Sequence, residues 1–237
     1  MKIGLLVCDQ VLPELTAQHS SYEAMFKNLL LQIDPLLEFE IYLAYANQLP
    51  SSVDECDVYL STGSKHSVND DLPWVTQLIE FIAKLHSHKK KFIGICFGHQ
   101  LIAKALGGEV SVSDRGWGVG VAFNQVLQTQ PWMQCSGAGK ADSLDIVVSH
   151  KEQISRLPVT CKVIAGNKFC PQFMIQVDQH MLGIQGHPEF SKQYSKSLIN
   201  TRLDIIEPNR VREAFCSLNA EVDDLKMAAW MLNFYVH

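Results

Sequence analysis

Hydrophobic residues in the first half of the chain follow two alternating patterns. Short apolar runs of strand length lie at residues 3–7, 58–60 and 92–95. Apolar residues recur at helical spacing in the segments between and after them, at residues 22–31, 73–85 and 98–106. Strands that alternate with helices predict an α/β fold, with a doubly wound, mostly parallel central sheet, flanking helices and right-handed crossovers.

The second half of the chain has a different pattern. Strand-like segments lie at residues 110–126, 144–148, 163–165, 173–177 and 181–184, and we expect a few of these strands to be antiparallel. Residues 131–143 are rich in Gly, Ala, Ser and Asp, which predicts an exposed loop. Residues 191–237 have a helical pattern and are expected to pack on the rest. Because the sequence shows neither a repeat nor a linker, we predict a single domain, 1–237.

Composition and charge narrow the classes of partner. The chain has 237 residues, of which 47% are hydrophobic, enough for a sizeable core. Its net charge is -5, and its main basic run, His88–Lys91, follows a predicted helix, where cations favour the C-terminus. We therefore expect neither nucleic acid nor a membrane as a partner.

The cysteines and the N-terminal segment indicate the compartment. Seven cysteines are scattered without a CxxC pair, so neither a zinc ribbon nor a thioredoxin-like site is indicated, and free buried thiols are expected. The apolar run at residues 3–7 is too short for the core of a signal peptide or for a membrane span. These features predict a cytoplasmic protein, whose oligomeric state the sequence does not indicate.

The strongest chemical signal is the segment Gly94–Gln100, which reads Gly-Ile-Cys-Phe-Gly-His-Gln between a predicted strand and a predicted helix. A nucleophile flanked by glycines at this spacing is typical of a sharp strand-to-helix elbow. The elbow places Cys96 at the carboxyl end of the sheet and at a helix N-terminus, where the dipole favours the thiolate. The N–H of Phe97 is then available to bind an oxyanion. A buried cysteine in an ordinary turn is the alternative, and the flanking glycines favour catalysis.

A thiol nucleophile needs a base, and the segment Gly183–Phe190 supplies a candidate. His187 follows a short apolar strand, so it too is expected at the edge of the sheet. Glu189 comes two residues later, beyond Pro188, which keeps the preceding residue extended. Glu189 could therefore fold back and orient the imidazole of His187. A loop histidine near a solvated glutamate is the alternative interpretation.

Together the two segments resemble those of class I glutamine amidotransferases. Residues 94–108 are similar to the nucleophile segment of that family, and residues 183–190 are similar to its His/Glu segment. The resemblance covers residues 1 to about 190, and it is closest to stand-alone proteins similar to the amidotransferase domain of GMP synthase. It implies the flavodoxin-like fold of the family.

The resemblance also implies further site residues. Ser61–Ser64 is similar to the oxyanion loop, which implies that the N–H of Gly63 or Ser64 acts with that of Phe97. Many members have Gly-Gly-Pro where this chain has Gly63, Ser64 and Lys65. Three further residues match positions near the bound glutamine, namely Gln100, Ser149 and His150. Residues 116–120 stand where members often have Glu-Ile-Gly, so this part of the pocket is expected to differ.

The chemistry that the resemblance implies is covalent. Cys96 attacks the γ-amide of glutamine, a γ-glutamyl thioester forms, and water releases glutamate, with no metal or organic cofactor. The first hypothesis is a glutaminase that passes ammonia to a partner synthetase. The second is a stand-alone γ-glutamyl peptidase or hydrolase with the same Cys96, His187 and Glu189 triad. The third is a non-catalytic binding module, against which the intact triad argues.

Two weaker signals lead to no functional prediction. His86 and His88 are two residues apart near a predicted helix end, so they do not share a helix face and form a poor metal pair. His180 lacks a ligand partner at metal spacing in the sequence. The glycines of residues 116–120 do not have the spacing of a dinucleotide-binding fingerprint.

Overall fold

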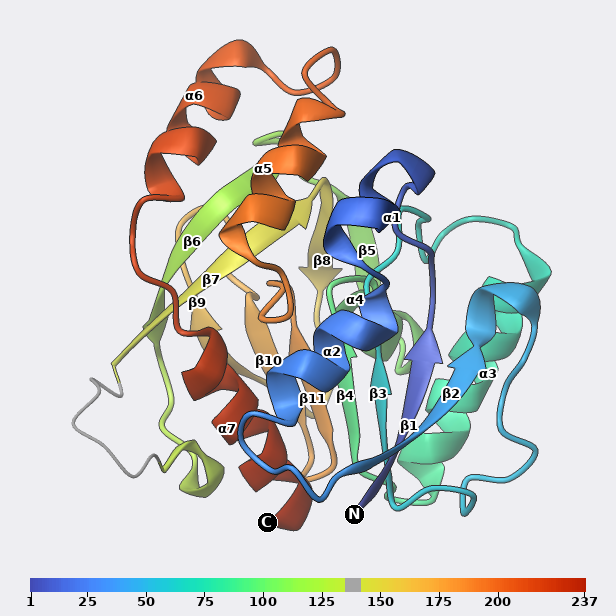
Figure 1. Ribbon diagram of the computed structural model, residues 1–237. Helices are drawn as coiled ribbons and strands as arrows, with labels where there is room; N and C mark the ends of the chain where they lie inside the picture. Colours follow the sequence, from blue (N-terminus) through green and yellow to red (C-terminus); the bar gives the residue numbers. More distant parts are fainter. Residues whose placement is uncertain (135–141) are drawn as a thin grey trace.

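The computed structural model describes residues 1–134 and 142–237 (Figure 1). The strands are β1 (Lys2–Val7), β2 (Glu38–Leu43), β3 (Val58–Ser61), β4 (Phe92–Ile95), β5 (Glu109–Val112), β6 (Gly118–Val126), β7 (Ser143–His150), β8 (Glu152–Arg156), β9 (Cys161–Gly166), β10 (Met174–Val177) and β11 (Met181–Ile184). The helices are α1 (Pro13–His19), α2 (Tyr22–Leu30), α3 (Pro73–Ser87), α4 (Phe97–Ala105), α5 (Lys192–Asn200), α6 (Pro208–Ser217) and α7 (Asp224–Val236). Two short 3₁₀ turns are η1 (Ala44–Ala46) and η2 (Pro131–Met133).

The central sheet is mixed. Within the described residues it has nine strands, in the order β2-β1-β3-β4-β11-β10-β9-β6-β7. The strands from β2 to β11 pair in parallel, and those from β11 to β7 pair antiparallel. A separate antiparallel pair joins β5 and β8. The predicted α/β fold is confirmed, and its antiparallel part is as extensive as its parallel part.

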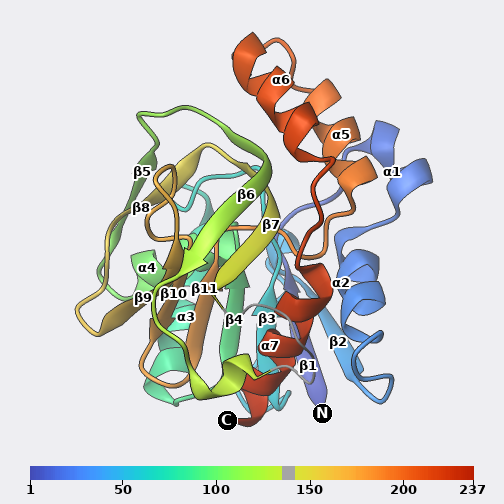
Figure 2. The ribbon, with the colours of Figure 1, turned by 90° about the vertical axis from the view of Figure 1, so that its left-hand side faces the viewer.

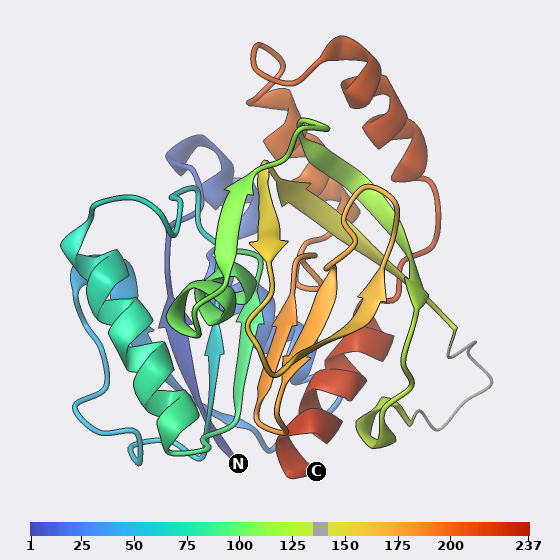
Figure 3. The ribbon, with the colours of Figure 1, turned by 180° about the vertical axis from the view of Figure 1, so that it is seen from behind.

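Helices cover both faces of the parallel strands. In Figure 1, α2 and α7 lie in front of the sheet, and Figure 3, which is seen from behind, shows α3 and α4 on the opposite face. Each face has its own buried cluster, one lined by Phe26 and Trp230, the other by Leu78 and Leu101. Two sequence features explain where these helices begin: the Ser21 hydroxyl accepts a hydrogen bond from Ala24 N at α2, and Pro73 opens α3.

Two predictions, one of a strand and one of a loop, need correction. The predicted strand at 110–126 is two strands, β5 and β6, because residues 113–117 form a turn in which Gly116 has a φ of 75°. The predicted loop at 131–143 falls largely on residues 135–141, outside the described residues. Its first part is not an exposed loop, since Trp132 and Met133 are buried in η2. The Trp132 indole donates a hydrogen bond to Gln176 Oε1 at 3.0 Å.

The C-terminal segment forms three helices with two different locations. Figures 1 and 2 show α5 and α6 beyond the carboxyl ends of the parallel strands, with α5 beside α1 and α6 against β6. Helix α7 instead returns along the face of the sheet, where Trp230, Met231 and Phe234 are buried in the core. Its Tyr235 hydroxyl donates to the carbonyl of Tyr59 on β3 at 2.8 Å. None of the described helices has the length and apolar character required to cross a membrane.

The thiols are mostly buried, as expected from the sequence. Cys8, Cys56, Cys96 and Cys170 are buried and free. Cys161 is partly exposed and Cys216 is exposed, so the expectation of buried thiols is wrong for Cys216. Cys135 lies outside the described residues.

Candidate active site

Cys96 occupies the sharp turn between β4 and α4. Its φ is 52° and its ψ is -96°, a backbone conformation that a residue with a side chain rarely adopts. The turn depends on two glycines: a Cβ on Gly94 would overlap the Gly98 carbonyl, and a Cβ on Gly98 would overlap the Ser61 hydroxyl. The amide of Cys96 donates to the carbonyl of Ile184 on β11 at 2.7 Å. These contacts hold the predicted elbow in place.

The elbow puts both the sulfur and a backbone donor at the helix start. Cys96 directly precedes the first residue of α4, and it is only 5% exposed. Phe97 is that first residue, so its N–H has no intrahelical acceptor. The phenyl ring of Phe97 packs on Trp74, with ring centroids 5.6 Å apart. Phe97 therefore can contribute its backbone, and not its side chain, to chemistry at the sulfur.

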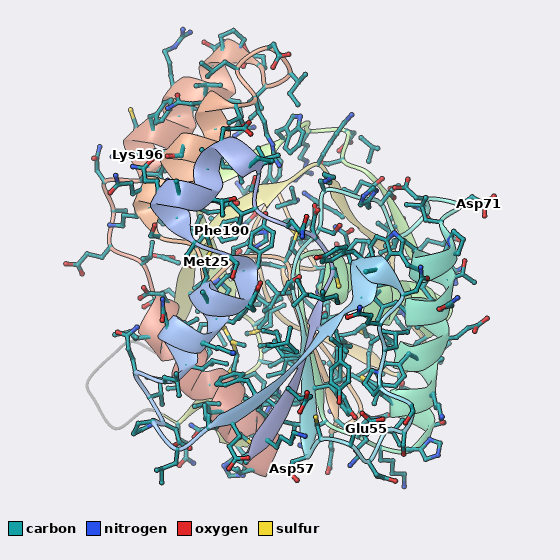
Figure 4. The ribbon with its side chains drawn as sticks, turned by 45° about the vertical axis from the view of Figure 1, so that its right-hand side comes forward. Met25, Glu55, Asp57, Asp71, Phe190 and Lys196 are labelled. Carbon is teal, nitrogen blue, oxygen red and sulfur yellow. The ribbon has the colours of Figure 1, made fainter. Side chains whose placement is uncertain are left out.

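His187 and Glu189 follow β11, the strand paired with β4. His187 Nδ1 lies 2.7 Å from Glu189 Oε1, and both side chains are buried. The amide of His187 donates to the Val147 carbonyl at 2.8 Å. The ring of Phe190 stacks on the imidazole, with centroids 4.0 Å apart and planes 8° apart. Figure 4 shows Phe190 beside Met25 of α2, so the stacking ring is itself supported by the core.

The surroundings of His187 change its pKa. Burial alone lowers the pKa, but the Glu189 carboxylate and the charge on the Cys96 sulfur outweigh burial and raise it. Because Nδ1 faces Glu189, Nε2 is left for the cysteine side of the ring. The imidazole can therefore hold a proton next to the sulfur, as a general base requires.

The loop after β3 brings Gly63 against both groups. A Cβ on Gly63 would lie 2.7 Å from His187 Cε1 and 3.5 Å from Cys96 Cβ, so only glycine leaves room here. The neighbouring Thr62 anchors the loop, because its hydroxyl accepts from the Cys8 amide at 2.9 Å. Asp9 anchors its other end.

Asp9 is a residue that the sequence analysis did not select. It follows β1 and is buried, and its carboxylate accepts from Lys65 N at 2.8 Å and from Lys65 Nζ at 3.1 Å. This ion pair fixes the loop that carries Gly63 and Ser64. An aspartate directly after a buried strand, at the same sheet edge as Cys96, was the available signal.

The three residues expected near bound glutamine line one cavity with Cys96. This cavity has a volume of about 520 Å³, and its walls include Gln100, Ser149 and His150. A smaller cavity of about 40 Å³ beside it is lined by Gly63, Ser64, Ser149 and His187. The structure thus brings together the predicted residues from four separate segments, with Glu189 behind His187 and Phe97 present through its backbone.

Several polar groups at this cavity hydrogen bond to one another. Gln100 Nε2 donates to Gln185 Oε1 at 3.2 Å and to the Glu152 carbonyl at 2.9 Å. Gln185 Nε2 lies 3.4 Å from Cys96 Sγ, a contact that the sequence analysis missed. Burial lowers the pKa of His150 to about 4, so this imidazole is neutral at pH 7.

A possible metal-ligand group lies elsewhere. In the described parts of the chain, His86, Asp178 and His180 have ligand atoms within 4.8 Å of one another. They lie at the end of α3 and in the β10–β11 turn, at the end of the sheet opposite Cys96. His86 Nδ1 and His180 Nε2 already hydrogen bond to each other at 3.0 Å. In the sequence His86 stands two residues from His88, and only the fold brings His180 to it.

The fold and the elbow define an α/β protein with a cysteine at the strand-to-helix turn and a histidine–glutamate pair on the next strand. Residues 22–204 match the family model "Glutamine amidotransferase class-I". The chain belongs to the class I glutamine amidotransferase family.

Comparison with individual proteins agrees with this family. Gamma-glutamyl peptidase 3 of Arabidopsis thaliana is 27% identical, over 71% of this chain and 69% of the relative. A glutamine-hydrolyzing GMP synthase component of Methanothermobacter thermautotrophicus is 33% identical, over 47% of this chain and 56% of the relative. The solved structure of a glutamine amidotransferase from Methylobacillus flagellatus has the same fold. It superposes with a TM-score of 0.74 at 22% identity, over all of this chain and 92% of that one.

Proposed function

We propose that this chain hydrolyses γ-glutamyl amide bonds through a γ-glutamyl thioester on Cys96. The observation that carries the proposal is the arrangement of three groups on adjacent strands. Cys96 stands on a strained elbow, and His187 faces it with Nδ1 held 2.7 Å from Glu189. This is the order of nucleophile, base and orienting carboxylate that thiol catalysis needs.

The reaction has two halves. His187 takes the thiol proton, and the thiolate attacks the γ-carbonyl carbon. The carbon–nitrogen bond then breaks as His187 returns the proton to the leaving amine. In the second half, water gives a proton to His187 and attacks the thioester carbonyl. The carbon–sulfur bond breaks, free glutamate leaves, and the sulfur recovers its proton.

Backbone donors stabilise the oxyanion in both halves. The N–H of Phe97 lies at the helix start beside the sulfur, and the loop of Gly63 and Ser64 closes on the same space. Removal of one well-aimed donor costs roughly 3 kcal/mol of transition-state stabilisation in comparable sites. The Asp9–Lys65 ion pair contributes indirectly, because it fixes the loop that holds Gly63.

The size of the cavity favours a leaving amine larger than ammonia. Ammonia is close in size to water, which occupies about 30 Å³ in the liquid. The cavity at Cys96 measures about 520 Å³, and a second cavity of about 470 Å³ shares Trp117, Lys151 and Ile205 with it. A γ-glutamyl peptide would use this space, and the similarity to proteins named gamma-glutamyl peptidase supports the same substrate class.

Glutamine is the second candidate substrate. Membership of the glutamine amidotransferase family and similarity to a component of a glutamine-hydrolyzing GMP synthase support hydrolysis of glutamine, with ammonia passed to a partner synthetase. In that case the extra space would admit part of the synthetase or remain filled with water.

The two candidates separate in one assay. Purified protein is incubated with glutamine or with γ-glutamyl-glycine, and released glutamate is measured, with the Cys96→Ala variant as control. Faster release from the peptide, absent in the variant, supports a peptidase. Faster release from glutamine, rising with an added synthetase, supports an amidotransferase. Failure of both substrates, together with failure of a glutamine-like electrophile to label Cys96, would favour a non-catalytic module.

A further inference from the structure

Arg202 is a cation in the wall of the active-site cavity, and within residues 1–134 and 142–237 its charge has no carboxylate partner. It follows α5 and lines both the 520 Å³ cavity with Cys96 and the small cavity with Gly63 and His187. Its side chain is partly buried. In the described structure, its Nη1 donates to Ser149 Oγ at 2.7 Å, and its guanidinium lies 5.1 Å from the centre of the Trp117 ring.

Unlike Arg202, the other cations near this cavity either form an ion pair or are solvated by water. Lys65 pairs with Asp9, and Arg210 pairs with Glu213. Among the groups whose charge favours protonated Arg202, after Tyr22, Tyr194 and Cys96, Asp9 is the carboxylate, but its oxygens are already bound to Lys65 and to the Gln10 amide. Lys151 lines the same cavity and is exposed, so water solvates it.

A partly buried guanidinium costs free energy unless another group compensates its charge. Burial lowers the pKa of Arg202, yet a guanidinium keeps its proton at any pH near neutrality. Ser149 accepts one of its five N–H groups, and the indole of Trp117 supports its flat face. These contacts fix the orientation of the group and leave donors for an anion in the cavity. A planar guanidinium binds a carboxylate with two parallel hydrogen bonds.

We propose that Arg202 binds a free carboxylate of the substrate and thereby selects γ-glutamyl compounds among amides. The inference rests on the proposed function, since it names the group that the same cavity recognises. A γ-glutamyl peptide offers two such carboxylates, the α-carboxylate of its glutamyl part and the terminal carboxylate of its leaving part. Arg202 borders both the space beside His187 and the larger cavity, so either carboxylate can reach it.

The test combines variants with substrate analogues. Arg202→Met keeps much of the side-chain length and removes the charge, and Arg212→Met, an exposed arginine on α6, is the matched control. The substrates are γ-glutamyl-glycine, its analogue with an α-carboxamide, and γ-glutamyl-glycinamide. For the unmodified protein we expect kcat/KM to fall about 10²-fold with one of the two analogues. Arg202→Met should lose a similar factor with γ-glutamyl-glycine and should no longer distinguish that analogue.

The analogue that loses its effect identifies the source of the carboxylate. Loss of discrimination against the α-carboxamide assigns Arg202 to the glutamyl part, and loss against the glycinamide assigns it to the leaving part. Equal discrimination by the protein with and without Arg202 would overturn the proposal. Arg202→Lys should restore part of the activity, which a purely structural role through Trp117 packing does not explain.

A binding measurement separates this inference from the proposed reaction. Titration calorimetry of γ-glutamyl-glycine into Cys96→Ala, and into the same variant with Arg202→Met, does not require turnover. We expect the second variant to bind at least 10-fold more weakly, with a melting temperature close to that of the first. Arginine-dependent binding without hydrolysis by the unmodified protein would reject the proposed reaction and keep the carboxylate site. Binding of equal strength by both variants would reject the site.

Discussion

The two halves of the central sheet contribute to the site in different ways. The parallel half places the groups of the proposed chemistry: Cys96 follows β4, His187 follows β11, and Gly63 follows β3. These groups are fixed largely by backbone geometry and by glycines. The antiparallel half and the segment after α5 contribute side chains, Ser149 and Arg202, that face the same cavity. In terms of the proposed function, the parallel half of the sheet sets the reaction, while the antiparallel half and the segment after α5 set the substrate.

The largest effect is expected for the nucleophile. Cys96→Ala should reduce γ-glutamyl hydrolysis to the background rate, because no other described thiol lines the cavity. Cys216→Ala, at an exposed thiol on α6, is the control and should keep full activity. The measurement is steady-state glutamate release, together with mass spectrometry of the protein after a glutamine-like electrophile. Retained activity in Cys96→Ala would place the chemistry elsewhere.

The orienting carboxylate should have the next largest effect. Glu189→Gln keeps the shape of the side chain but removes the charge that favours the protonated form of His187. Because proton transfer by a positioned base contributes typically about 10²–10⁴-fold, we expect kcat to fall by about 10² or more with little change in KM. Melting temperature and kcat/KM are measured together. A variant with unchanged kcat would show that Glu189 only packs against His187.

Gly63→Ala tests whether the backbone groups positioned by the parallel half of the sheet matter for catalysis. The added methyl would lie 2.7 Å from His187 Cε1, so the loop or the imidazole must shift by several tenths of an ångström. We expect a loss of about 10-fold in kcat, from displacement of an oxyanion donor. Gly107→Ala, after α4 and away from these cavities, is a control for the added methyl group, since a Cβ there would meet no atom within 4 Å and its φ of 84° adds only backbone strain. Equal activities would show that the Gly63 loop does not bind the oxyanion.

The smallest effect concerns stability as a function of pH. Burial lowers the pKa of His99, on α4 behind the elbow, to about 3, against an ordinary value near 6.5. The unfolded chain therefore binds more protons than the folded chain, so the stability from neutral His99 is present above pH 6.5 and decreases from there towards pH 3. The contribution of His99 to the free energy of unfolding changes by at most about 1.4 kcal/mol per pH unit.

His99→Gln should show a flatter pH dependence of the unfolding free energy between pH 6.5 and 4 than the unmodified protein. Urea titrations at several pH values measure it, and the comparison of slopes holds even if the variant is less stable at every pH. Parallel slopes would mean that His99 is protonated, or exposed to water, in the folded state.

The sequence predicted those parts of the site that depend on short segments. The elbow needs Gly94, Cys96 and Gly98 at fixed spacing, and His187 and Glu189 are two residues apart, so local rules were sufficient. Arg202 could not be predicted in this way, because its position depends on where α5 ends relative to β7. The contact of Gln185 with the sulfur likewise depends on the pairing of β4 with β11.

The fold, too, could be predicted where it depends on short segments and not where it depends on contacts between distant segments. Helix and strand periodicity predicted α2, α3 and α4 to within two residues, but it joined β5 to β6 because apolar residues continue on both sides of Gly116. Trp132 was predicted in an exposed loop, since the small polar residues after it dominate the segment. Its burial depends on α7, about 100 residues later in the chain, whose Trp230 and Phe234 rings contact it.

The pairing of β4 with β11 determines which parts of this chain can accept insertions and substitutions. Ile95 and Ile184 are directly opposite each other in register, and the Cys96 amide donates to the Ile184 carbonyl at 2.7 Å. The distance between the cysteine and the histidine is therefore set by one row of backbone hydrogen bonds, whatever the chain does between them. Turns within residues 106–180 can lengthen, shorten or acquire new side chains without moving the cysteine and the histidine, as long as β7 keeps the Val147 carbonyl that accepts from the His187 amide at 2.8 Å. If the proposed function holds, new substrates can arise by insertion in these turns while the reaction is inherited unchanged.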